Sequence, residues 1–245
     1  MEMKEKHYVL LGGAVILIIC SSIIAGGLSG INQPPKKISV TGSAQRVIES
    51  DVVKWNIKLS RQVELNKLSD GYTQMNNDLK KINEFLKKND IKGDELSTSP
   101  INVNKEQVES TNDKGTVVKN YYYILTQNYS IESKDINKIS KAVDESASLI
   151  RDGIPLESVG LEYYYSKLAD LKLEMLTEAT KNAQERAKQV SSAAGSGLAG
   201  LESADMGVFQ LTRVNSTEIS DYGSYDTSSY EKQITATVHT EFRLR

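Results

Sequence analysis

The stretch DVVKWNIKLSRQV, residues 51–63, decides the fold class of this chain. Every second side chain in its middle is apolar, and the apolar set is Val53, Trp55, Ile57 and Leu59. Polar side chains separate them, namely Lys54, Asn56, Lys58 and Ser60. This period of two is typical of a strand that turns one face to a core and the other to solvent. A second layer must therefore cover the apolar face.

Residues 68–86 are predicted to supply that layer. Their apolar side chains recur at spacings of three and four, the period of an amphipathic helix. The set is Leu68, Tyr72, Met75, Leu79, Ile82 and Leu86. The stretch spans barely three heptads, so a helix lying on a sheet is favoured over a coiled coil.

The other strands are predicted from the same alternation and from β-branched and aromatic residues. They are expected at 38–44, 99–105, 121–132, 156–165, 200–209 and 233–244. Residues 106–119 are predicted to be a polar hairpin connection, and residues 215–232 a long polar loop.

Two further helices are expected. Asp135 is a good N-cap for the first, which is predicted to reach residue 150 before Gly153 and Pro155 end it. The second is predicted over 167–194, with Gly195 as its left-handed C-cap. Its apolar stripe is Leu168, Leu171, Met175, Ala179, Ala183, Ala187, Val190 and Ala194. The order of elements predicts an α+β fold, a largely antiparallel mixed sheet with about three amphipathic helices layered on it.

The N-terminal region carries a membrane signal. Residues 8–28 form a largely apolar run with no charged residue, long enough at about 1.5 Å per residue to cross a bilayer core of about 30 Å. We expect a transmembrane anchor in residues 1–30, a Pro-containing linker at 31–37 and an exported domain at 38–245. The predicted location is the cell membrane, with a single-pass N-terminal anchor and the domain outside the cytoplasm.

The alternative is a cleaved signal peptide, because Ala25-Gly26-Gly27 offers small residues to a peptidase. The domain would then be secreted or periplasmic. A retained anchor is favoured because the apolar run exceeds the usual signal core of about 7–15 residues. Cys20 is read as a buried apolar residue of the anchor, since bulky Ile19 precedes it where lipoprotein processing needs a small residue.

Composition excludes several classes of function. The chain has 30 Lys and Arg against 32 Asp and Glu, a net charge of −2, so nothing favours a nucleic-acid partner. Its one cysteine and two histidines, Cys20, His7 and His239, are too few for a zinc site of Cys and His. No catalytic, metal-binding or cofactor-binding residue is nominated, and no cofactor is expected.

Several residues have both a functional and a structural interpretation. His239 is expected to point outward from the last strand and to be solvated. Glu218, Asp221 and Asp226 are too sparse for a dedicated calcium loop. The glycines at 195, 197 and 200 follow a helix rather than a strand, so a phosphate loop is rejected.

The tyrosines are more informative. Two triplets, Tyr121–Tyr123 and Tyr163–Tyr165, occupy strand-like positions, and Tyr222, Tyr225 and Tyr230 lie in the predicted loop. Consecutive side chains of a strand alternate between its faces, so each triplet exposes a ring unless both faces are covered. Two interpretations of these tyrosines remain equally open: they belong to an interface, or they pack under helices of the same domain.

Three stretches resemble the SIMPL-domain family: VTGSA at 40–44, IKGDELST at 91–98 and ERAKQVSSAAGSGL at 185–198. The resemblance covers residues 38–245, with departures at Ser50, where the family often has proline, and in the loop 215–232. It implies an extracytoplasmic α+β protein. It also implies homo-oligomers, since some members form rings, and roles in envelope integrity or oxidative-stress tolerance. It brings no established catalytic residues.

The expected function is therefore non-catalytic: homo-oligomerisation or protein contacts in the cell envelope, related to stress. The expected partners are a second copy of the chain and an envelope protein, with the membrane bound through the N-terminal helix. One alternative is a peptide or small-ligand binding module that uses the exposed tyrosines. Another is an envelope enzyme with a pair of carboxyl groups of separated pKa, for which the sequence offers no pair.

Overall fold

The computed structural model of the chain describes residues 36–111, 115 and 117–245. The predicted anchor, 1–30, and most of the predicted linker, 31–37, lie outside these residues. No helix within the described ranges is both long and apolar enough to span a bilayer.

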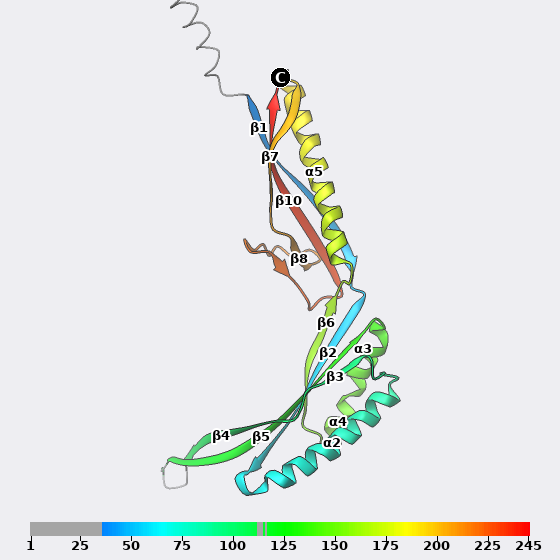
Figure 1. Ribbon diagram of the computed structural model, residues 1–245, viewed down its shortest axis with the longest axis vertical. Helices are drawn as coiled ribbons and strands as arrows, with labels where there is room; N and C mark the ends of the chain where they lie inside the picture. The colour runs from blue at the N-terminus through cyan, green and yellow to red at the C-terminus, as the bar shows by residue number, and fades with distance from the viewer. Residues whose placement is uncertain (1–35, 112–114, 116) are drawn as a thin grey trace, which may run out of the picture. The chain divides into compact units, whose positions relative to one another are not determined.

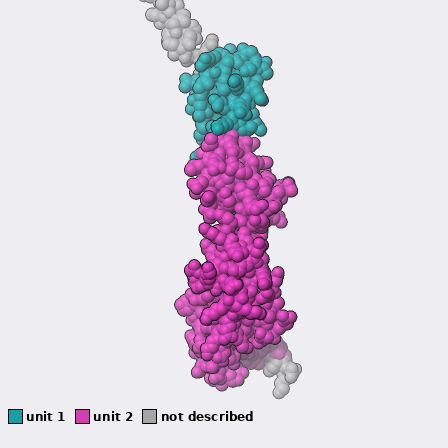
Figure 2. Space-filling model, turned by 90° about the vertical axis from the view of Figure 1, so that its right-hand side faces the viewer, with its two compact units in different colours: residues 1–42, 180–206, 238–245 teal, residues 43–179, 207–237 magenta. Residues whose placement is uncertain are grey.

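The described chain divides into two compact units, coloured separately in Figure 2. The first contains residues up to 42 together with 180–206 and 238–245. The second contains 43–179 and 207–237. Three of the unit boundaries fall inside one helix and two strands, and each unit is built from more than one stretch of the sequence.

A five-stranded antiparallel sheet organises the second unit. Strand β2 (Val52–Glu64) lies between β5 (Val117–Ser133) and β6 (Leu156–Tyr164). Strands β3 (Leu96–Thr98) and β4 (Asn102–Thr111) both pair with β5, at different places along it. The remaining strands form a separate five-stranded sheet, so the expected single sheet is in fact two. Alternation within a strand indicates its faces and does not identify its neighbours.

Helices cover one face of this sheet (Figure 1). After a short 3-10 turn, η1 (Leu65–Lys67), helix α2 (Leu68–Lys88) packs against β2 and β5. Helices α3 (Ile136–Glu145) and α4 (Ala147–Arg151) take the place of the single helix predicted after Asp135. The predicted alternation of β2 is confirmed, because its four apolar side chains are at most 2% exposed.

One detail of α2 differs from the prediction. Tyr72, predicted to lie in the buried stripe, is 38% exposed, whereas Asp78 is only 5% exposed. Asp78 is buried because Arg61 of β2 donates two hydrogen bonds to its carboxylate, one of them 3.0 Å long from Nη2 to Oδ1. A buried ion pair of this kind leaves no mark on the apolar period of the helix.

The first unit contains parts of α5 (Leu168–Ala193), β1 (Lys37–Glu49) and β10 (Glu231–Leu244), with all of β7 (Leu198–Met206). Its pairing of β10 with β7 is antiparallel. The alanine stripe is confirmed at Ala183 and Ala187. It is wrong beyond them, since Ser191 takes the next buried position, Val190 is 53% exposed, and Ala194 is also exposed. Gly195 has φ of +71°, and the N–H of Ser196 donates to the Ser191 carbonyl, which confirms the predicted C-cap.

The predicted strand 200–209 is interrupted. β7 ends at Met206, and a separate β8 (Gln210–Arg213) pairs with β10 in the second unit. The short β9 (Ser224–Tyr225) lies parallel to β8 inside the predicted loop. The break occurs at Gly207, where an added Cβ would collide with Thr237 Oγ1, so only glycine fits there.

Three other boundaries are corrected. The predicted strand 99–105 begins later than expected, because β4 starts at Asn102, after Pro100, which has no N–H to donate. β3, at 96–98, was not predicted. The predicted connection 106–119 contains residues 106–111 of β4 and the first three residues of β5, which are paired with one another. Residues 106–111 are polar apart from Val108, and the adjacent Val117 and Val118 lie on opposite faces, so the alternation that marks a half-buried strand is missing. The helix after Asp135 breaks at Ser146, whose hydroxyl donates to the Val143 carbonyl.

Candidate functional site

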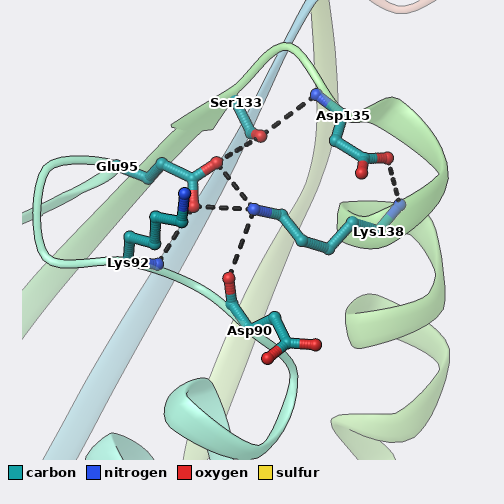
Figure 3. A network of polar contacts seen from close by, with 6 residues as sticks. All are labelled: Asp90, Lys92, Glu95, Ser133, Asp135 and Lys138. Atoms are coloured by element: carbon teal, nitrogen blue, oxygen red, sulfur yellow. Dashed lines mark hydrogen bonds and ion pairs between the residues drawn. The ribbon is translucent and has the colours of Figure 1, made fainter.

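A polar network surrounds the first turn of α3 (Figure 3). The carboxylate of Asp135 caps the helix by accepting from the N–H of Lys138 at 2.9 Å, as the sequence predicts. The Nζ of Lys138 lies 2.7 Å from each carboxylate oxygen of Glu95. It also donates to the carbonyl of Asp90, 3.3 Å away. One lysine thus joins α3 to the turn that follows α2.

Glu95 is the centre of this network. Its partial burial opposes ionisation, but hydrogen bonds from Lys138, from the N–H of Lys92 and from the Ser133 hydroxyl outweigh this and lower its pKa to about 2. A carboxyl group with that pKa is ionised at neutral pH and cannot donate a proton as a general acid. The arrangement can instead hold three chain segments together.

An open hollow of about 680 Å³ lies beside the network in the second unit. It is lined by Lys134, Asp135, Ile136, Asn137, Tyr163 and Tyr230. The two tyrosine rings meet edge to face, with centroids 6.1 Å apart and an interplanar angle of 73°. The Tyr230 hydroxyl donates to the Glu49 carboxylate at 2.9 Å, and this hydrogen bond raises the pKa of the phenol.

The departure from the family pattern at Ser50 helps to hold Tyr230. The N–H and the hydroxyl of Ser50 both donate to the Tyr230 carbonyl, at 3.0 and 2.9 Å. A proline at this position could donate neither bond. Ser50 is only 3% exposed, so the two donors also satisfy polar groups that are removed from water.

The structure separates the other residues that the sequence singled out. His239 is exposed as predicted, and its Nδ1 lies 2.8 Å from the Thr41 hydroxyl. Asp226 accepts from the N–H and hydroxyl of Ser228 and faces Lys232, with 3.9 Å between its Oδ2 and Nζ. In the described part of the chain, no cluster of three or more His, Cys, Asp and Glu is placed to hold a metal.

Lys232 was missed by sequence reasoning. It is 1% exposed, and it donates to the Ser229 carbonyl, while burial lowers its pKa. Its position in the alternation of β10 is a buried one, shared with Ile234 and Ala236. This position could have indicated that Lys232 is buried, because side chains two residues apart along a strand lie on the same face.

The two tyrosine triplets have different surroundings. In the second triplet, Tyr163 lines the hollow, and Tyr164 donates from its hydroxyl to Glu162. The first triplet lies on a projecting ribbon that we call the arm, residues 104–111 of β4 and 117–124 of β5. At the base of the arm, residues 122–124 of β5 also pair with β2. Figure 1 shows the arm leaving the sheet on the side away from α2. Tyr222 belongs to neither and is 97% exposed.

The arm exposes apolar side chains. Val108 is 44% exposed, Val117 58%, Val118 38% and Tyr121 43%. Lys105 Nζ lies 4.9 Å from the centre of the Tyr121 ring, a cation–π distance. A two-stranded ribbon is only marginally stable in water by itself, and this one carries the apolar surface that a partner would cover.

Comparison with known proteins identifies a family. A family model named SIMPL, described as a protein of unknown function (DUF541), matches residues 38–242. No curated protein matches the chain. The matched residues include the network, the hollow and the arm.

Proposed function

The chain belongs to the SIMPL family, and from this premise we propose that it acts without catalysis, by self-association or protein contact through the arm. The observation that carries the proposal is the exposure of valine and tyrosine side chains on a paired ribbon. Association would remove these side chains from water and contribute about 25 cal/mol per Å² of apolar surface covered.

The proposed place of this activity is the outer side of a cell membrane, with residues 8–28 as the anchor. Tethering raises the effective concentration of the domains, so a contact that is weak in solution would suffice. Assembly there would contribute to envelope integrity under stress.

The pKa shifts of the carboxyl groups support the proposal that the protein is not a catalyst. Among the described residues, three carboxyl groups have clearly shifted pKa values, those of Asp51, Glu95 and Asp226. In each, hydrogen bonds outweigh partial burial and lower the pKa. An envelope hydrolase that works with two carboxyl groups needs one of them raised.

The test is the solution mass of the protein across a range of concentrations. Light scattering after size exclusion is applied to the full chain in detergent and to residues 37–245 without it. We expect a discrete multimer in both samples, weakened when Val108 and Val118 are replaced by serine. Monomers of both samples at high concentration would overturn self-association.

A second candidate function is binding of a peptide or small ligand in the hollow. The observation in its favour is that Tyr163 and Tyr230 line a space of about 680 Å³ beside the exposed Lys134. A panel of short peptides that contain aromatic and acidic residues is the probe, with the melting temperature as the readout. Binding predicts a rise in Tm that Tyr163→Ala abolishes and Tyr72→Ala, at an exposed position on α2, does not.

A further inference from the structure

The outer edge of β4 is free among the described strands. β4 pairs with β5 along its whole length, from Asn102 opposite Thr126 to Thr111 opposite Val117, and with no other strand that the structure describes. Nine of its ten residues are exposed, and Val103 is half-buried. The strand has no proline and no bulge, two devices that natural edges use against pairing.

We propose that this edge binds the same edge of a second copy of the chain, antiparallel, with the two-fold axis at Gln107. The inference rests on the proposed self-association and names its surface. The two arms would then form one four-stranded ribbon, in which the free N–H and C=O groups of each β4 pair with those of the other.

The charges along β4 select this register. A two-fold axis through an antiparallel strand pair places one residue opposite its own copy. An axis at Gln107 places Lys105 opposite Glu109 of the second copy, and Glu109 opposite Lys105, so both pairs attract. These residues alternate along the strand and share one face of the ribbon.

The neighbouring registers are worse. An axis at Lys105 places two lysines face to face, and an axis at Glu106 does the same with two glutamates. An axis at Val108 removes the opposite-charge pairs and shortens the overlap. The register at Gln107 also overlaps nearly the full strand, with Val103 opposite Thr111.

The partner groups already lie on the ribbon surface. Glu109 accepts from Gln107 Nε2 at 3.3 Å, and its Oε1 lies 3.7 Å from Lys119 Nζ. Lys105 stands over the Tyr121 ring. Adding the second copy would extend each row across four strands, so that Lys119 and the Lys105 of the other copy flank Glu109.

Disulfide trapping tests the register directly. The full chain, with Cys20→Ser to remove its one cysteine, is prepared in detergent with Gln107→Cys or with the control Thr111→Cys. Opposed residues have Cα atoms about 4.5–5.5 Å apart, within disulfide reach. Two copies of residue 111 would be eight residues apart, about 27 Å at 3.4 Å per residue.

We expect Gln107→Cys to form covalent dimers under mild oxidation at least tenfold faster than Thr111→Cys. Equal rates overturn the register. The cysteine-free chain is measured by light scattering in parallel. A multimer whose Gln107→Cys variant does not cross-link leaves self-association standing and removes this edge from it, whereas a strict monomer removes both.

A charge-swap experiment gives an independent test. Lys105→Glu makes the two copies repel at residues 105 and 109, and Glu109→Lys does so with the opposite sign. In a mixture of the two variants, a carboxylate again faces an ammonium group at both ends, with one pair native and the other reversed. We expect each variant alone to associate at least tenfold more weakly and the mixture to recover most of the loss. Undiminished association of the single variants overturns the proposal.

Discussion

The two halves of strand β5 differ in how deeply their side chains are buried, although both halves pair with neighbouring strands. In its C-terminal half, Leu125, Tyr129 and Ile131 are at most 2% exposed, under helices α2 and α3. In its N-terminal half, which forms the arm, no described residue from 117 to 124 is buried. Both halves are paired in antiparallel fashion: β2 pairs with residues 122–133 of β5 and β4 with residues 117–126, so the two pairings overlap at residues 122–126.

The difference shows that regular backbone pairing does not by itself make a segment stable. Hydrogen bonds hold both halves in register, but their net contribution is about 1 kcal/mol each or less, since water offers the same bonds to the unfolded chain. Covered apolar surface is what the C-terminal half has and the arm lacks. The arm therefore has surface to offer a partner, and variants of the two halves are expected to behave differently.

The largest effect is expected for Trp55 in the covered region. Its side chain is fully buried, and its Nε1 donates to the Ser158 hydroxyl at 2.9 Å. Trp55→Ala leaves a large cavity and is expected to reduce the free energy of unfolding by about 3–5 kcal/mol. Denaturant titration by circular dichroism measures it. A loss under about 1 kcal/mol would mean that this core is not packed as described.

The next effect concerns the buried pair of Asp78 and Arg61. Asp78→Ala leaves the guanidinium of Arg61 without its main partner, and we expect a loss of about 2–3 kcal/mol, because the arginine side chain is still 22% exposed. The matched control is the surface pair of Glu64 and Lys67, whose side chains are 60% and 56% exposed. Glu64→Ala is expected to cost at most about 1 kcal/mol, and equal losses would contradict the assignment.

The same two regions explain how much of the fold could be predicted from the sequence. Where a helix covers a strand, the period of two appears in the side chains, and the buried face of β2 could be predicted residue by residue. Beyond its base, where Tyr123 packs against the core, the arm lacks that period because neither of its faces is covered. Its residues therefore looked like a connection, although their pairing is regular.

The polar contacts could be predicted less well from the sequence. Asp135 was identifiable as a cap from its place before a helical pattern. The partner of Lys138, Glu95, is 43 positions away, and only the folded chain brings the two together. The pair of Arg61 and Asp78 could not be predicted for a different reason. An aspartate on an amphipathic helix is normally assigned to the solvent-exposed face, whereas Asp78 is buried.

A smaller effect with a defined pH dependence is expected at Glu95. Its pKa of about 2 in the folded chain lies below the ordinary value, so its contribution is complete above about pH 4.5 and disappears as the pH falls toward 2. Glu95→Gln is expected to lose about 1–2 kcal/mol of unfolding free energy at pH 7, and little of that difference should remain at pH 2. Denaturant titrations at both pH values measure it.

The control for this prediction is Glu106→Gln. Glu106 is an exposed residue of the arm with no ion-pair partner among the described residues. We expect its replacement to leave the unfolding free energy unchanged at both pH values. A difference between Glu95→Gln and the parent that persists unchanged at pH 2 would show that the carboxylate charge is not the stabilising element.

The smallest effect on folding, and the largest on association, is expected for Val108→Ser. The valine is 44% exposed in the single chain, so its replacement removes little surface that folding covers, and the free energy of unfolding should change by less than about 0.5 kcal/mol. In the proposed pairing Val108 lies opposite Glu106 of the second copy, which would cover part of its surface, so the dissociation constant measured by light scattering should rise several-fold. Val159→Ser, at a 51% exposed position on β6, is the control and should change neither quantity. If Val108→Ser instead destabilises the monomer as a core cavity does, the arm is covered within its own chain, and the contrast between the two halves of β5 does not hold.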